Sequence, residues 1–277
     1  MINTILFGFT TGAILYFISI GFSLTFGTMR VINFAHTLSY AIGAYIVMTA
    51  VTYWGMGFEF GMVFALLLLI PLSYVIERFI IRRLYGESLD YAFIATYAVA
   101  LIGIDFIKWI WGVHAHPLRD PIRISLDLLG LRFPLYRILI VGAALILFIA
   151  IQLFMKRTIV GKVIIAALED KDHVRALGIS VEKYFSLVFV IGSVLAACGG
   201  VLYAPITAIH PYMGMQFILL CFAVVVVGGM GNINGTFYSA FTLGMVVAIT
   251  GRYWPQGAEA MIFVAMAVVL IIRPIDI

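Results

Sequence analysis

The first 29 residues of the sequence carry no charged side chain, and Arg30 is the first charged residue. A helix needs about 20 residues to cross the hydrocarbon layer of a membrane, so this stretch is long enough to span it. It lacks the basic residues that precede the apolar core of a cleaved signal peptide, and we therefore expect it to be the first span. Of the 277 residues 64% are hydrophobic and 11% charged, against about 25% charged in a soluble domain. The sequence excludes a soluble globule and predicts one membrane domain, residues 1–277.

Apolar runs of membrane length recur along the chain. The runs at 64–70 and 224–227 are apolar at every position, whereas the strands of an outer-membrane barrel alternate apolar and polar residues. Helices also satisfy their backbone hydrogen bonds within one segment, as lipid requires. We therefore predict an all-α fold, a polytopic transmembrane helix bundle of about 8–9 spans with one or two broken or re-entrant segments. The expected spans are residues 4–26, 36–54, 59–80, 91–111, 136–155, 185–204, 214–230, 236–250 and 258–272.

Charged residues are concentrated in three hydrophilic stretches, at 82–87, 112–135 and 156–184. The first and third are two spans apart and therefore lie on the same side. Both are rich in Lys and Arg, which favour the cytoplasmic side, so we expect the N-terminus outside and, after nine crossings, Arg273 inside. The net charge of +4 is scattered among apolar runs and forms no basic stripe of the kind that binds nucleic acid.

Two segments, 27–36 and 228–235, interrupt the apolar runs. Paired interruptions in corresponding parts of two halves of a chain indicate a transport path. For the glycine-rich second segment, the alternative is a helix–helix turn with glycine as a C-cap and asparagine as a turn former. For the histidine of the first segment, the alternative is a hydrogen-bonded packing residue. The candidate residues for a translocation path or gate are Asn33, His36, Gly228, Gly229, Gly231, Asn232 and Asn234.

The two interruptions are also similar to each other. Four pairs of identical residues match at one constant offset, which is the pattern of an internal repeat, although four matches in a short window can also arise by chance. The pairs are Gly27 with Gly228, Met29 with Met230, Ile32 with Ile233, and Asn33 with Asn234.

The third hydrophilic stretch has the pattern of a short helix outside the membrane. From Val163 to Leu177, apolar Ile165, Leu168 and Ala176 lie near one face, charged residues lie on the other, and Gly178 follows as a stop signal. Such a helix needs a surface to dock against. The alternative is a solvated loop held only by its charges.

Small residues recur at every fourth position in two of the expected spans. They let neighbouring helices approach closely, so we expect them to make helix–helix contacts rather than solute contacts. The two sets are Gly192, Ala196 and Gly200, and Ala240, Gly244 and Ala248.

Several segments resemble the signatures of one family, in the order in which the family carries them. The matching segments are residues 21–27 (GFSLTFG), 29–36 (MRVINFAH), 177–179 (LGI) after Ala167 and Glu169, and 226–235 (VVGGMGNING). The family is that of the integral-membrane permease subunits of branched-chain amino acid ABC importers. The likeness covers nearly the whole chain.

The resemblance implies an inner-membrane subunit of a bacterium or archaeon. It implies a core of two permease chains, either two related chains or two copies of this one, with two cytoplasmic ATPase subunits and a periplasmic solute-binding protein. It further implies that the 156–184 loop couples the permease to a groove of the ATPase. The implied coupling residues are Ala167, Glu169, Ala176, Leu177 and Gly178.

No Gly-x4-Gly-Lys-Ser/Thr loop occurs in the chain, because Gly161-Lys162 lacks the preceding glycine at the needed spacing. We therefore expect no cofactor on this chain and place the use of ATP and Mg on the partner ATPase subunits. Branched-chain amino acids are the solutes that the resemblance implies. Similar permeases accept other amino acids, urea, short amides or aromatic acids, and no residue of this chain selects among them.

An ion-coupled secondary transporter of small solutes is the first alternative function. It should place ionisable groups deep in the bilayer, where they are costly and usually serve coupling. Only Asp105 and Lys108 come close, and a local ion pair explains them equally well. Glu59, Glu77 and Glu259 fall near the ends of expected spans, where we expect them at the membrane interface.

An intramembrane enzyme is the second alternative function. The chain has no His-Glu-x-x-His and no Gly-x-Ser-x-Gly motif, and its five histidines are dispersed. His114 and His116 supply only two ligands from one loop, too few for a convincing metal site. The sequence therefore predicts a non-catalytic chain without a metal site.

Overall fold

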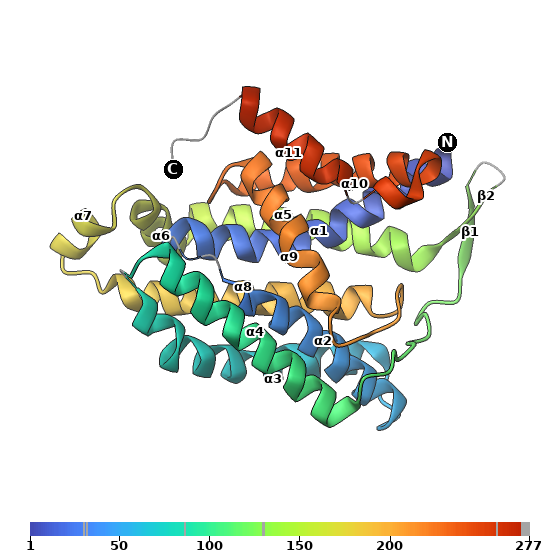
Figure 1. Ribbon diagram of the computed structural model, residues 1–277, viewed down its shortest axis with the longest axis horizontal. Helices are drawn as coiled ribbons and strands as arrows, with labels where there is room; N and C mark the ends of the chain where they lie inside the picture. Colours follow the sequence, from blue (N-terminus) through green and yellow to red (C-terminus); the bar gives the residue numbers. More distant parts are fainter. Residues whose placement is uncertain (30, 32, 86, 129–130, 259, 273–277) are drawn as a thin grey trace.

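The computed structural model describes residues 1–29, 31, 33–85, 87–128, 131–258 and 260–272. Arg30, Ile32, Glu259 and Arg273, which figure in the sequence analysis, lie outside the described residues. The described part of the chain forms a helical bundle with one hairpin (Figure 1). In order, its elements are α1 (Ile2–Met29), α2 (Ala35–Thr52), α3 (Phe58–Phe79), η1 (Ile81–Leu84), α4 (Leu89–Trp111), β1 (Ser125–Leu128), β2 (Leu131–Pro134), α5 (Leu135–Arg157), α6 (Ile159–Glu169), α7 (Lys171–Ala176), α8 (Val181–Tyr203), α9 (Met213–Gly228), α10 (Ile233–Tyr253), η2 (Pro255–Gly257) and α11 (Ala260–Ile272).

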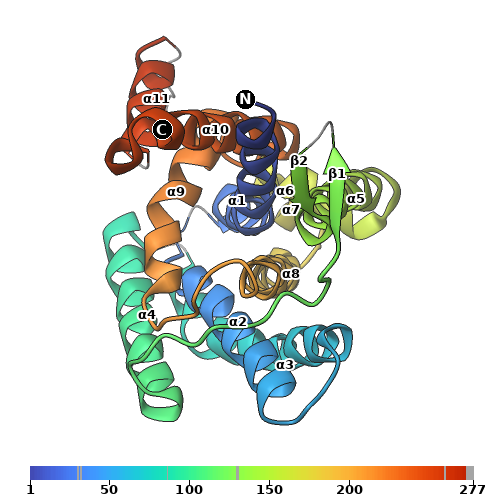
Figure 2. The same cartoon turned by 90° about the vertical axis from the view of Figure 1, so that its right-hand side faces the viewer.

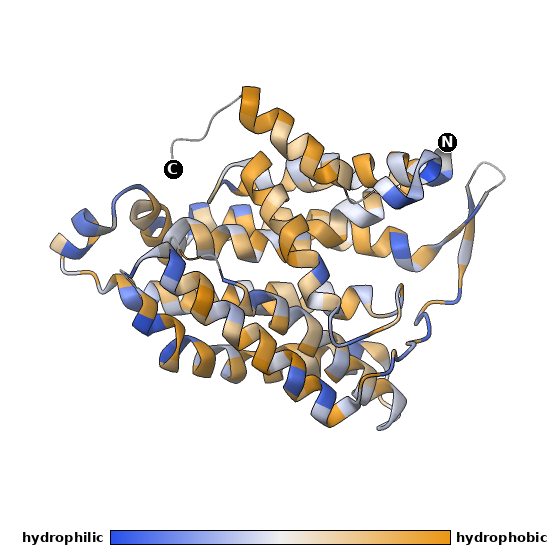
Figure 3. Cartoon of the chain, in the orientation of Figure 1, coloured by the Kyte–Doolittle hydropathy of each residue, from blue (hydrophilic) through white to orange (hydrophobic). Residues whose placement is uncertain are grey.

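The predicted membrane bundle is confirmed. Six described helices, α1, α3, α4, α5, α8 and α10, are long and apolar enough to cross a membrane. The other three expected spans correspond to α2, with 18 residues, and to the shorter α9 and α11, with 16 and 13. Apolar residues run along these helices, whereas hydrophilic residues gather at the ends of the bundle and in α7 (Figure 3).

Helix α1 lies at the centre of the bundle, with α5, α8, α9 and α10 around it (Figure 2). In its most apolar 18-residue window 72% of the residues are buried, against 22% in α3 and in α5. The expected small-residue contacts hold α1 in place. A Cβ on Gly244 of α10 would lie 2.5 Å from Cα of Gly12, and one on Gly192 of α8 would lie 2.9 Å from the carbonyl oxygen of Gly21. These close approaches confirm the packing role of the small residues.

Helix α2 is also a core element. All its residues except Thr49, Val51 and Thr52 are buried, since it packs against α3, α4, α8 and α9. Tyr40 and Tyr45 are completely buried within it. Helices α3, α4, α5 and α11 form the outside of the bundle and keep large apolar side chains exposed, as helices that face lipid do.

The hydrophilic 112–135 stretch contains a β-hairpin that the sequence analysis did not predict. Strands β1 and β2 pair antiparallel, with Asp127 opposite Arg132. Strands of four residues are too short to leave a clear alternating pattern. The hairpin lies at the end of the bundle opposite α6 and α7 (Figure 1).

Candidate functional site

The first interruption is a short buried connection between α1 and α2. Asn33 within it is 2% exposed, and its side-chain nitrogen and oxygen have no hydrogen-bond partner among the described residues. His36, in the first turn of α2, is 1% exposed, and its Nε2 lies 2.9 Å from the carbonyl oxygen of Ile18. Its ring also packs edge-on against Phe22. The environment of His36 is thus that of a packing histidine between α1 and α2.

The second interruption has the backbone of a tight helix–helix turn. Gly228 ends α9, and Gly229 and Gly231 have φ angles of +88° and +76°, which favour glycine. The side chain of Asn232 caps α10 by accepting a hydrogen bond of 3.0 Å from the amide of Gly235. Asn234 lies in the first turn of α10 and accepts a hydrogen bond from Gln152 of α5. The turn chemistry therefore accounts for the glycines and for Asn232.

The two interruptions meet in space although about 200 positions separate them in the sequence. A Cβ on Gly27 would lie 2.7 Å from Cα of Gly231 and 2.8 Å from Cδ2 of Leu168 in α6. Leu168 is therefore inserted where the end of α1 faces the α9–α10 turn. A cavity of about 220 Å³ opens beside this contact and is lined by Thr28 and Glu169, among others.

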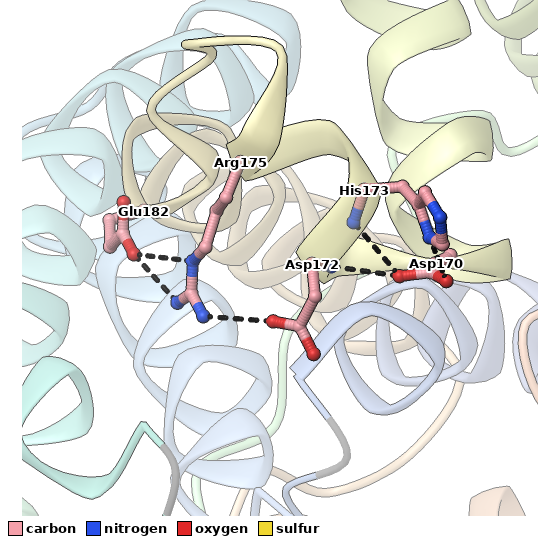
Figure 4. A network of polar contacts seen from close by, with 5 residues as sticks. All are labelled: Asp170, Asp172, His173, Arg175 and Glu182. Atoms are coloured by element: carbon pink, nitrogen blue, oxygen red, sulfur yellow. Dashed lines mark hydrogen bonds and ion pairs between the residues drawn. The ribbon is translucent and has the colours of Figure 1, made fainter.

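The expected single helix over 163–177 is wrong, because the structure has two helices with a break at Asp170. Asp170 has extended backbone angles (φ −152°, ψ 99°) and ends α6. Its carboxylate accepts hydrogen bonds of 2.9 and 3.0 Å from the amides of Asp172 and His173, which caps α7 (Figure 4). The ring of His173 also pairs with Asp170. These hydrogen bonds, above all the one from the His173 amide, hold the pKa of the Asp170 carboxyl below its usual range.

The buried face of these two helices also differs from the expectation. Ile165 is 38% exposed and Ala176 is exposed, whereas Ile164, Ala167 and Val174 are buried. The break at Asp170 rotates α7 relative to α6, so one helical wheel cannot describe both. The expected stop at Gly178 is confirmed, since the helix ends before it and its φ is +80°.

Four of the five expected coupling residues are exposed at the end of the bundle. Glu169, Ala176, Leu177 and Gly178 face solvent, and the Leu177 side chain is 79% exposed. Ala167 instead packs inward. Arg175, near the end of α7, forms ion pairs with Glu182 of α8 at 2.7 Å and with Asp172 at 3.4 Å, which connect α7 to α8 (Figure 4). An exposed apolar tip on a braced charged segment is suited to contact with another protein.

A small apolar cluster attaches α6 and α7 to the bundle. It consists of Ala167, Val174, Val181 and Phe185, and Tyr85 from the connection after η1 packs against it. The ring of Tyr85 meets that of Phe185 edge-on at 5.7 Å. The hydrophilic stretches at 82–87 and 156–184 therefore lie at the same end of the bundle, as predicted.

Glu77, expected near the end of a span, is buried in the bundle. Glu77 lies near the end of α3 but is 0% exposed, and the Tyr85 hydroxyl donates a 2.8 Å hydrogen bond to its Oε1. The sequence analysis missed Tyr85 and Leu168 as site residues. A lone glutamate inside an apolar run is a signal that a buried partner exists, but the sequence does not say which residue it is.

The two charged residues named for the secondary-transporter alternative form a local ion pair. Asp105 and Lys108 pair with each other at 2.9 Å near the end of α4, as the local explanation predicts. Among the described residues no group of three or more His, Cys, Asp or Glu is arranged to hold a metal ion.

The bundle has buried central helices and outer helices that expose apolar faces, and a charged two-helix segment packs against its two interruptions. This is the build of a membrane transport subunit. The family model of the branched-chain amino acid transport system permease component matches residues 4–272. The chain belongs to this family.

Similar proteins carry the same description. The chain is 25% identical to the high-affinity branched-chain amino acid transport system permease protein LivH of Salmonella typhimurium, over 98% of this chain and 92% of that protein. It is 27% identical to the corresponding BraD protein of Pseudomonas aeruginosa, over 98% and 93%. It is also similar to a probable LivH permease of Methanocaldococcus jannaschii, with 26% identity over 87% and 80%.

One solved structure shares the fold. It is PsaBC from Streptococcus pneumoniae in complex with Fab, with a TM-score of 0.50 and 15% identity, covering 98% of this chain and 89% of that one. This likeness concerns the fold alone.

Proposed function

We propose that the chain carries branched-chain amino acids, or a related small solute, across the cell membrane of a bacterium or archaeon as part of an ATP-driven importer. The observation that carries the proposal is the position of the 156–184 segment. On its inner side Leu168 lies against Gly27 and Gly231, one residue from each interruption, and on its outer side Leu177 is 79% exposed. A partner that moves this segment would act directly on the two interruptions.

The partner proposed for the exposed tip is a cytoplasmic ATPase subunit. Glu169, Ala176, Leu177 and Gly178 would enter its groove, while Ala167 anchors the segment to the bundle. Two such subunits would bind and hydrolyse ATP with Mg. The permease core would contain a second chain, either a related permease or a copy of this one. This arrangement places the 156–184 segment inside the cell and the N-terminus outside.

Solute would reach the opposite end from a periplasmic binding protein. Asn33, His36 and the 228–234 turn would form the path or its gate once α1 and the turn separate. Asn33 supports this proposal, because its buried amide has no partner among the described residues, which is costly, and it gains hydrogen bonds when the contact opens to water or solute. Motion between discrete packed arrangements is how such a gate switches.

Reconstitution tests the proposal. The chain is co-purified with its genomically adjacent ATPase, permease and binding-protein chains, and uptake of radiolabelled leucine into proteoliposomes is measured with and without ATP. For the wild type we expect ATP-dependent uptake. In Leu177→Asp we expect that uptake to be lost, because the ATPase no longer co-purifies with the chain. The matched control is Val113→Asp, since Val113 is 66% exposed at the opposite end of the bundle. Uptake that needs an ion gradient but no ATPase would contradict the proposal, and urea uptake in place of leucine would change the solute only.

A further inference from the structure

A narrow apolar groove runs along the outside of the bundle between α5 and α8. Both helices pack against α1 but stand apart from each other (Figure 2). The groove has a volume of about 230 Å³, with Leu24 of α1 among its lining residues, Ala150 and Phe154 from α5, and Ile191 and Leu195 from α8. Because all the lining residues are apolar and lie on membrane-spanning helices, we expect the groove to exclude water.

Positively charged residues stand at one end of both walls of the groove. Helical spacing places Arg157 on the same face of α5 as Ala150 and Phe154, seven and three positions away. Lys183 lies in the first turn of α8, eight positions before Ile191 and about 80° around the helix axis from it, so its long side chain is offset from that wall of the groove. Both cations are exposed, and no ion pair within the described part of the chain involves either of them. Helix α5 ends and α8 begins beside the 156–184 segment, so both charges lie at the same end.

The dimensions fit one leaflet of a membrane. From Leu147, which lines the far part of the groove, to Arg157 is ten residues, or about 15 Å of helix. This is half of the ~30 Å hydrocarbon layer. An apolar slot of this length with two cations at its outer end matches an acyl chain below a negatively charged headgroup. The cytoplasmic leaflet is the one rich in anionic lipids.

We infer that the α5–α8 groove binds an anionic phospholipid, with one acyl chain over Leu24 and the headgroup phosphate between Arg157 and Lys183. The choice of leaflet rests on the proposed function, which puts the 156–184 segment inside the cell. A bound lipid would fill the space between α5 and α8 and fix the two helices that flank that segment. Neutral lipids would occupy the slot less, because they leave the two cations without a counter-charge.

Native mass spectrometry of the purified full chain tests the site. Dioleoyl phosphatidylglycerol and dioleoyl phosphatidylcholine are titrated separately. We expect retention of phosphatidylglycerol at concentrations about tenfold below phosphatidylcholine, and loss of this preference in the Arg157→Gln/Lys183→Gln double variant. The control double variant Arg78→Gln/Arg83→Gln removes two exposed cations at the same end of the bundle and should keep the preference.

A second pair of variants tests the groove itself. Ala150→Trp fills it and should lower retention of both lipids, whereas Ile146→Trp, at a 70% exposed position of α5, should not. Three results would overturn the inference. They are equal retention of the two lipids by the wild type, a loss in the control variants as large as in the test variants, and displacement of the lipid by glycerol phosphate. So would cross-linking of Ala150→Cys to a second protein chain in native membranes. The measurement needs neither ATPase nor solute, so lipid selectivity without ATP-dependent uptake would count against the proposed function alone.

Discussion

Gly27 of α1 and Gly231 of the α9–α10 turn face each other so closely that a Cβ on Gly27 would lie 2.7 Å from Cα of Gly231. Cδ2 of Leu168 would lie 2.8 Å from the same Cβ. The end of α1, the α9–α10 turn and α6 therefore meet in a single contact, in which Leu168 supplies the side chain. Movement of α6 cannot leave the other two elements unaffected, because packed interiors transmit small displacements.

Substituting Gly27 by alanine tests this contact. The backbone of Gly231 has to shift to admit a methyl group, so we expect Gly27→Ala to lower the free energy of unfolding by about 1–3 kcal/mol and to reduce uptake. Gly142→Ala in α5 is the matched control, since nothing lies within 4 Å of its added Cβ. Thermal unfolding in detergent measures both. Equal unfolding temperatures of the two variants would mean that the contact between α1 and the α9–α10 turn is loose enough to admit a methyl group.

Leu168→Ala should uncouple the transporter more than it destabilises the chain. Leu168 is only partly buried, so we expect a loss of about 1–2 kcal/mol, below the about 2–5 kcal/mol typical of fully buried leucines. ATPase co-purification should persist, while stimulation of ATP hydrolysis by the loaded binding protein should fall several-fold. Ile165→Ala, on the exposed side of the same helix, is the control. Normal stimulation in Leu168→Ala would contradict a transmitting role.

The Tyr85–Glu77 hydrogen bond should stabilise the connection between α3 and α4. Tyr85→Phe leaves the buried Glu77 carboxyl without its donor, and we expect a loss of about 1–3 kcal/mol. Glu77→Gln keeps an acceptor for the Tyr85 hydroxyl and should change stability much less. A double-mutant cycle of Tyr85→Phe with Glu77→Leu, which removes the acceptor, isolates the coupling between the two side chains by thermal unfolding. A coupling energy near zero would show that Tyr85 acts only through its packing on Phe185.

Order in α7 should depend on pH through Asp170. The folded pKa of this carboxyl lies below its unfolded value of about 3.9, so its stabilisation is fully present above that value and is lost as the pH falls through the folded pKa. Hydrogen-exchange protection of residues 172–176, corrected for intrinsic rates, should be constant from pH 7 to about 4.5 and then fall. Asp170→Asn keeps a capping oxygen but removes the titration. Persistence of the acid transition in Asp170→Asn would assign it to another group.

Much of the site could be predicted locally. The glycines at 178, 229 and 231 mark positions of positive φ, and Asn232 caps α10, because turn and cap chemistry depends on neighbours in the sequence. The face of the 163–177 helix was wrong because Asp170 satisfies two amides of α7 and starts a new helix there. Whether a polar residue continues a helix or caps the next one is decided by contacts of both helices with the bundle.

By itself, the sequence determined that the chain lies in lipid, where its helices run and to which family it belongs. Low charge and long apolar runs require lipid, and the positions of the runs set where the helices lie. Hydropathy could not determine which helices face lipid, because lipid tails and a protein core are equally apolar. Only the tertiary structure buried α2 and Glu77 and left most of α3 exposed. Only it brought Gly27, Gly231 and Leu168 together, since that contact depends on shape and close packing between segments far apart in the chain.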